Sequence, residues 1–162
     1  MSSGYERLAT LDEALDRIQK LSVQTAIFDI EPLVAYWDSG QQALDQGIAQ
    51  VLSRLGTLPE LKVICFSTNS VRRPSVLPDT HTPVRVVYLA MAGKPLRTSP
   101  YRDFPRPGAV IGDQVATDGI LARRLDYTFL ECGPPDHLPP GPRVMHGLGS
   151  LLRPLVFSQH GG

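Results

Sequence analysis

Acidic, hydroxyl and basic residues follow the ends of several apolar runs in this chain. Asp29 and Glu31 follow one run in the stretch FDIEPLVAYWD, and Ser67 ends the next run in FSTNS. Lys94 follows a third run in AGKPL, and Asp113 ends a fourth in IGDQVATD. A carboxylate nucleophile, a hydroxyl donor, a lysine and a pair of acids together suit phosphoryl transfer. Each of these residue types is also common in turns, so only the whole set carries the argument.

The apolar runs before these residues have the composition of buried strands. Five strands are predicted, at residues 23–30, 61–66, 84–91, 109–112 and 127–132. Three helices are predicted, one before the first strand and the other two between strands. The first follows a capping box that begins at Thr10, the second follows a similar pattern at Ser39 and stops at Gly56, and the third covers residues 117–125.

Strands of this kind that alternate with helices predict an α/β fold, with a mostly parallel five-stranded sheet flanked by helices in a three-layer, Rossmann-like arrangement. Ligands bind such sheets just beyond the carboxyl ends of the strands, where the polar residues lie. Residues 1–133 are expected to form this domain. Residues 134–162 are rich in Pro and Gly and are expected to be a partly ordered C-terminal extension.

The composition is that of an ordinary globular domain of 162 residues, with 42% hydrophobic and 20% charged residues. Sixteen basic residues balance sixteen acidic ones, so no basic field argues for a nucleic-acid partner. No signal peptide or transmembrane run is evident, and a soluble, cytoplasmic protein is expected. Cys65 and Cys132 lie in apolar runs and are expected to be reduced core thiols, and the four histidines show no ligand spacing.

The motifs resemble those of the haloacid dehalogenase (HAD) superfamily of magnesium-dependent phosphotransferases. Within it, the chain looks most like the small, cap-less YqeG-type phosphatases, relatives of phosphatidylglycerophosphate phosphatase. Their pattern is Asp-x-Asp-x-Thr with a Trp close behind, then Ser-Asn-Asn, Lys-Lys-Pro and Gly-Asp-Gln-x-x-Thr-Asp. The stretches FDIEPLVAYWD, FSTNS, AGKPL and IGDQVATDGILARRL match it in order and rough spacing from Leu11 to Cys132, and GDQVATD is the most specific match.

The resemblance implies a catalytic role for four residues. Asp29 would be the nucleophile that forms an aspartyl-phosphate, and Glu31 would be the general acid and base. Ser67, together with Thr68 and Asn69, would bind the phosphoryl oxygens. Lys94 would also contact the phosphate and balance its charge: the catalytic set is Asp29, Glu31, Ser67 and Lys94.

The implied cofactor is Mg²⁺, which prefers hard oxygen ligands. Asp29, Asp113 and the main-chain carbonyl of Glu31 are suited to hold it, and the resemblance adds Asp118 as a supporting carboxylate. Trp37 matches the family's aromatic residue, either as simple packing or as part of the site lining.

The first motif departs from the family pattern in two ways. Glu31 replaces an Asp, which moves the carboxyl away from the backbone by one methylene, and a shift of about 1 Å at a reacting group can lower a rate about a hundredfold. Pro32 and Leu33 then remove a backbone donor and a hydroxyl from the phosphate loop, and Pro32 favours an extended backbone at Glu31.

Two hypotheses therefore remain. The first is a Mg²⁺-dependent phosphomonoester hydrolase that acts through Asp29. The second is a weak or inactive domain of the same fold that binds a phosphorylated ligand or a partner protein. A two-component receiver domain fits less well, because its acidic pair comes before the acceptor Asp in the chain.

The partner implied by either hypothesis is a phosphorylated small molecule, a lipid headgroup or a protein. An open site without a cap domain suits all three classes of partner. The sequence does not indicate an oligomeric state. Arg72 and Arg73 are either a second anion contact or a solvated loop pair.

Overall fold

The computed structural model describes residues 4–75, 83–133, 148–149 and 151–157. The four histidines and most of the predicted extension lie outside these ranges: His81, His137, His146, His160 and residues 134–147.

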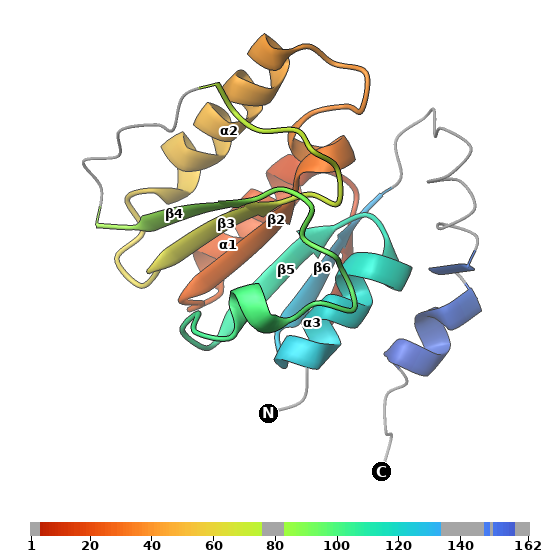
Figure 1. The fold of residues 1–162 in the computed structure, drawn as a ribbon. Helices are drawn as coiled ribbons and strands as arrows, with labels where there is room; N and C mark the ends of the chain where they lie inside the picture. The colour runs from red at the N-terminus through yellow and green to blue at the C-terminus, as the bar shows by residue number, and fades with distance from the viewer. Residues whose placement is uncertain (1–3, 76–82, 134–147, 150, 158–162) are drawn as a thin grey trace.

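One sheet of six strands forms the centre of the molecule (Figure 1), in the order β1-β6-β5-β2-β3-β4. Every pairing between neighbouring strands is parallel, as the alternation of strands and helices predicts. The strands are β1 (Tyr5–Leu8), β2 (Thr25–Asp29), β3 (Val63–Ser67), β4 (Arg85–Leu89), β5 (Gly108–Gly112) and β6 (Thr128–Cys132). The five predicted strands are confirmed, with β4 clearly shorter than expected.

Helices cover both faces of the sheet, which gives the three layers predicted (Figure 1). The α-helices are α1 (Leu11–Lys20), α2 (Gln41–Leu55) and α3 (Ile120–Leu125), and shorter helical turns occur at Ile30–Val34, Ser99–Tyr101 and Val115–Gly119. α1 and α2 pack with Phe28 and Phe66 on one face, whereas α3 packs with Ile27 and Cys65 on the other. None of the described helices combines the length and apolar content that a bilayer span requires.

The two core layers follow from the alternation of side chains along fully buried strands. All five residues of β2, β3 and β5 are buried, so these strands form the centre of the sheet. Cys65 and Cys132 are free and buried, as predicted, and burial raises the pKa of each thiol to about 12.

Three local predictions differ from the structure. β1 was not predicted because its four residues include Glu6 and Arg7, and it pairs only at the edge of the sheet, with β6. Ser39 does not cap α2: its hydroxyl donates to the Tyr36 carbonyl at 2.7 Å, and Gly40 occupies the cap position. α3 begins at Ile120, after a wide turn, whereas Thr10 caps α1 as expected.

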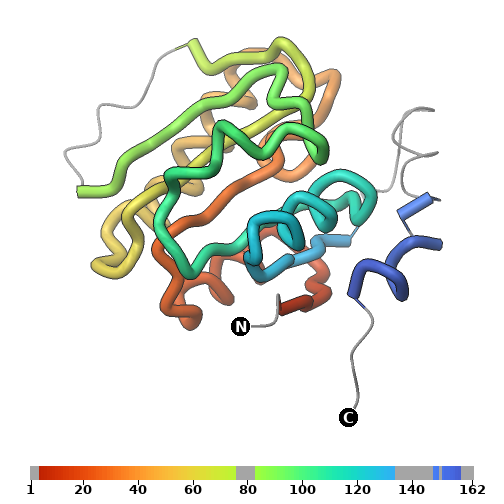
Figure 2. The backbone as a smooth tube through the Cα atoms, turned by 60° about the horizontal axis from the view of Figure 1, so that its bottom comes forward, coloured from red at the N-terminus to blue at the C-terminus, as the bar shows by residue number. Residues whose placement is uncertain are grey.

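The segment 151–157 packs against the β1 edge of the sheet (Figure 2). The Phe157 ring lies 4.6 Å from the Tyr5 ring and 5.5 Å from the Phe129 ring, measured between centroids. Arg153 pairs with the buried carboxylate of Glu131 at 2.5 Å, and Tyr5 donates a hydrogen bond to the same carboxylate. Segment 151–157 therefore covers part of the same face of the sheet that α3 covers.

Candidate active site

Three buried carboxylates meet at the carboxyl ends of the two central strands β2 and β5. Asp29 is the last residue of β2, Asp113 follows β5, and Asp118 lies on the turn Val115–Gly119. One oxygen from each lies within 4.8 Å of the others. Because β2 and β5 are parallel neighbours, their ends deliver these residues to the same edge of the sheet.

Lys94 supplies the cation of this cluster. Its Nζ donates to Asp29 Oδ1 and to Asp118 Oδ1, both at 2.9 Å, and its side chain is buried. Asn69 holds the Lys94 backbone by donating to its carbonyl at 3.0 Å and accepting from its N–H at 2.9 Å. Gly93, with a φ of 72°, forms the turn that brings the lysine to this position.

The carboxylates and the lysine shift each other's protonation. Burial raises the pKa of Asp29 well above its ordinary value, Asp118 adds to the rise, and Lys94 opposes it. Burial alone would lower the pKa of Lys94, but Asp118 and Asp29 raise it above its usual value. Lys94 therefore stays charged between Asp29 and Asp118. With Asp113 close to both, this group of buried carboxylates is suited to hold a further positive charge.

Asp118 reaches the lysine by passing close to the main chain at Gly112. A Cβ at this position would lie 2.3 Å from Asp118 Oδ2. Gly112→Ala is therefore expected to displace Asp118 from Lys94 and to lower the free energy of unfolding by about 2 kcal/mol, measured by urea denaturation. Gly40→Ala is the matched control, because its Cβ meets nothing within 4 Å. Equal losses in the two variants would contradict the close approach.

A small pocket of about 120 Å³ opens onto this cluster. Asp29 and Lys94 line it, whereas Asp113 and Asp118 do not. Asp29 is 8% exposed, compared with 1% for Asp113 and 0% for Asp118. Among the clustered carboxylates, Asp29 is thus the one that a ligand in the pocket can reach. The pocket is lined by Asp29, Glu31, Trp37, Thr68, Asn69, Ser70, Lys94, Gln114 and Thr117.

Glu31 lines the same pocket, but its carboxylate is not part of the three-acid cluster. Thr68 donates to Oε2 at 2.6 Å and Ser70 donates to Oε1 at 3.1 Å. Arg72 lies 3.7 Å from Oε1 and donates to the Tyr36 carbonyl at 2.6 Å. Glu31 has an extended backbone, as Pro32 predicts, and its side chain is held by neighbours on the β3 loop.

The other predicted residues divide between the pocket and its support. Ser67 pairs with Asp29 in the strand register, yet it is fully buried beside the Tyr101 hydroxyl and does not line the pocket. Trp37 is among the residues that line the pocket. Arg72 ties its own loop to residues 36–39 through hydrogen bonds to the carbonyls of Tyr36 and Ser39.

Three pocket-lining residues had no role in the sequence prediction. Gln114 and Thr117 belong to the stretch GDQVATD, which was recognised only for its acids, and Ser70 follows the predicted Ser-Thr-Asn run. All three are polar residues within or next to the motifs, so the sequence marks them as candidates. It does not determine the path of the turns, which decides which of these side chains face the pocket.

The cluster suits a magnesium ion in the chemistry of its donors. All three side chains offer hard carboxylate oxygens, and Asp118 Oδ2 makes no hydrogen bond to another described residue. Mg²⁺ commonly combines one or two carboxylates with waters and a substrate phosphate, so the pocket beside Asp29 leaves room for such ligands.

Comparisons with protein-family models and with solved structures find no match for this chain. The assignment of a function therefore depends on the geometry of the site and on the resemblance of its motifs.

Proposed function

We propose that this protein is a Mg²⁺-dependent phosphomonoester hydrolase of the HAD type, related to the cap-less YqeG-type phosphatases, that acts through an aspartyl-phosphate on Asp29. One observation carries the proposal. Of three clustered, buried carboxylates, Asp29 alone lines the pocket, and the buried Lys94 bonds both to it and to Asp118.

In the proposed reaction, a carboxylate oxygen of Asp29 forms a bond to phosphorus as the bond from phosphorus to the ester oxygen breaks. The leaving alcohol takes up a proton, for which Glu31 is the candidate donor. Water then attacks phosphorus, gives a proton back to Glu31 and breaks the bond from phosphorus to Asp29, which releases inorganic phosphate and restores the Asp29 carboxylate. Lys94 stabilises the negative charge beside Asp29 throughout.

Asp29, Asp113 and Asp118, with the main-chain carbonyl of Glu31, are the residues that would hold Mg²⁺. The bound ion would supply positive charge to the phosphoryl oxygens. Thr68, Ser70 and Thr117 place hydroxyl groups on the pocket wall, where they suit a phosphate ligand.

Magnesium is expected to stabilise the protein as well as to support turnover. At about 100 times its Kd, a ligand of the native state adds about 2.7 kcal/mol, which should raise the Tm of a chain of this size by about 5–10 °C. Asp113→Asn should remove most of this shift and most of the turnover of p-nitrophenyl phosphate. Asp103→Asn, which alters an exposed acid, is the control and should retain both.

A parent protein that shows neither a magnesium-dependent shift nor heat of binding by calorimetry would contradict the metal site. Magnesium binding without any turnover would reject the hydrolase and leave a binding domain.

That second candidate, a catalytically weak domain that binds a phosphorylated ligand or a partner, is favoured by the contacts of Glu31. A general base must be free to take a proton from water, but both Glu31 oxygens already accept hydrogen bonds from Thr68 and Ser70. Holding the carboxylate in this way would slow the release of phosphate from Asp29.

Glu31→Gln and Glu31→Asp distinguish the two candidates. If Glu31 is the acid and base, Glu31→Gln should lower kcat about 100- to 1,000-fold, with little change in the Kd for inorganic phosphate. If the parent is inert and Glu31→Asp restores turnover, the binding domain is supported instead. Thr68→Val, which removes a Glu31 contact without changing the acid, controls for the hydrogen bonds alone.

The size of the pocket restricts which part of a substrate can enter it. The pocket is small and admits the phosphate group more readily than the rest of an ester, so the alcohol part would lie outside it. A phosphorylated small molecule, a lipid headgroup and a phosphorylated protein all meet this condition.

A further inference from the structure

The opposite edge of the sheet from β1 is formed by β4. Among the described residues β4 pairs with β3 alone, and the Leu89 carbonyl accepts from the Thr68 N–H at 2.9 Å. Since backbone direction alternates along a strand, the N–H and C=O groups of Val86 and Tyr88 point away from β3, to the free edge. An unpaired edge of this kind is a template for another strand.

The connections on either side of β4 leave it poorly covered. In the described parts, residues 68–75, 83–84 and 90–107, the only helix is the single turn Ser99–Tyr101. The last four residues of β4 are therefore partly exposed, whereas β2, β3 and β5 are fully buried. Proline-rich connections explain the difference, because they do not form the covering helices that such folds normally use.

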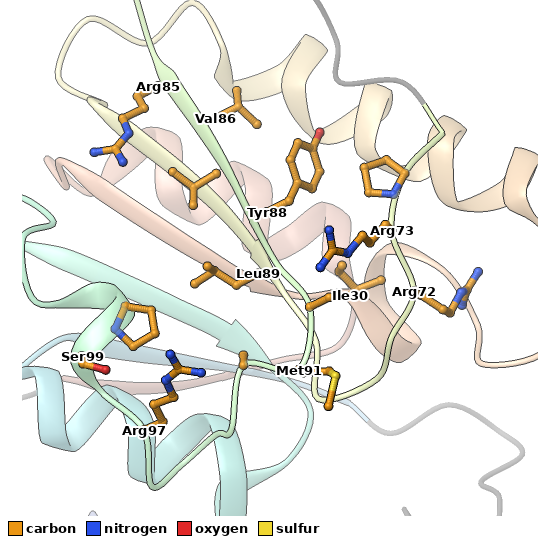
Figure 3. Close-up of a pocket in the computed structure, with 15 residues that line it drawn as sticks. Ile30, Arg72, Arg73, Arg85, Val86, Tyr88, Leu89, Met91, Arg97 and Ser99 are labelled. Carbon is orange, nitrogen blue, oxygen red and sulfur yellow. The ribbon is translucent and has the colours of Figure 1, made fainter.

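A groove of about 910 Å³ runs along this edge (Figure 3). Residues 72–74 form one wall and residues 97–100 contribute to the other. Its floor is largely apolar, from Val86, Tyr88 and Leu89, and Met91 at the end of β4 is 65% exposed. It differs in place and character from the small acidic pocket at Asp29.

The charge of the groove has a single sign. Four arginines and no acidic residue line it among the described residues: Arg72, Arg73, Arg85 and Arg97. Arg72 is engaged with the loop at residues 36–39, but Arg73, Arg85 and Arg97 are exposed and pair with no described carboxylate. In Figure 3, Arg73 and Arg97 extend from opposite walls toward β4.

We propose that the β4 edge binds an acidic peptide in an extended conformation, as an added strand of the sheet. The backbone of the peptide pairs with the free groups of Val86 and Tyr88. Acidic side chains at alternate positions meet Arg85 and Arg97, and the side chains between them pack on the apolar floor. The chain has no net charge, so this cluster is a local feature and not part of a general basic surface. The proposal goes beyond the hydrolase and does not depend on it.

The test uses the heptapeptide acetyl-EVEVEVE-amide, with acetyl-KVKVKVK-amide and a form of the acidic peptide N-methylated at alternate residues as probes. Calorimetry should detect binding of the first peptide alone. Amide hydrogen exchange should slow at Val86 and Tyr88 when it binds. Arg97→Glu and Arg85→Glu should each weaken binding about tenfold. Arg7→Glu is the control, because it reverses an exposed arginine on the opposite edge strand.

Four results would overturn the proposal. These are equal binding of the N-methylated peptide, equal weakening by Arg7→Glu, unchanged exchange at Val86 and Tyr88, and no binding of the acidic peptide. Sedimentation of the full chain adds a further check, since self-association lost in Arg97→Glu would show that a second copy occupies the edge. Each of these outcomes leaves the reaction at Asp29 untouched, so the two proposals fail independently.

Discussion

Asp29→Asn is expected to abolish ester hydrolysis and, at the same time, to stabilise the metal-free protein. Without the carboxylate no acyl phosphate can form, so kcat should fall at least about 10,000-fold. Asparagine keeps an oxygen that can accept from Lys94, but it removes one negative charge from a buried site where Asp29 and Asp118 share that lysine. Because burial and Asp118 raise the pKa of Asp29, we expect a gain of about 1 kcal/mol in the free energy of unfolding.

Two measurements check this expectation: turnover of p-nitrophenyl phosphate in magnesium, and urea unfolding in the presence of a chelator. Asp38→Asn is the control, because it removes an exposed carboxylate from the loop that follows the same strand. It should change the free energy of unfolding by less than about 0.5 kcal/mol. Retained turnover in Asp29→Asn would reject Asp29 as the nucleophile, and a loss of stability would reject the account of charge crowding.

The position of the site could be predicted because it depends on topology. Parallel strands bring their carboxyl ends to one edge, so acids that follow the apolar runs of β2 and β5 had to lie close together. The structure confirms that Asp29, Asp113 and Asp118 meet and that Lys94 joins them.

The finer arrangement depends on loop paths and rotamers, which the residue pattern does not encode. Glu31 and Asp29 are two residues apart, yet only Asp29 joins the acid cluster, because hydroxyl groups on the loop after β3 hold the Glu31 carboxylate. The resemblance implies that Ser67 binds the phosphoryl oxygens, but it is the last residue of β3 and its side chain is enclosed in the core. The next hydroxyl along the chain, that of Thr68, lines the pocket instead.

The edges of the sheet were the least predictable part of the fold. β1 carries two charges in four residues, and its pairing with β6 is a long-range contact that local pattern does not reveal. β4 was predicted as a longer strand because its apolar run continues past Leu89, where the chain turns at Met91, with a φ of 49°. The positions of the central strands can be predicted from sequence, because burial on both faces gives these strands nearly continuous apolar sequences.

Lys94→Met should have the largest effect on stability, because it removes the cation and keeps the volume of the side chain. Asp29 and Asp118 would then lose their 2.9 Å partner while remaining buried. Removing one member of a buried ion pair lowers the free energy of unfolding by about 3–5 kcal/mol. Urea denaturation without metal measures this loss, and Lys62→Met, at an exposed lysine, is the control and should be nearly neutral.

The loss of unfolding free energy caused by Lys94→Met should also depend on pH. The folded-state pKa of Asp29 is already raised, so its contribution to stability is present below its ordinary pKa of about 3.9 and is lost as pH rises through the folded value. Lys94 opposes the rise in the pKa of Asp29, so removing Lys94 should raise that pKa further and increase the stability lost at high pH. The difference between variant and parent should therefore widen as pH rises above the raised folded-state pKa of Asp29 in the parent, and Mg²⁺ should reduce it by neutralising the same carboxylates. A deficit that is independent of pH and of magnesium would mean that Lys94 supports the fold by packing, and that the three carboxylates do not act as one charged cluster.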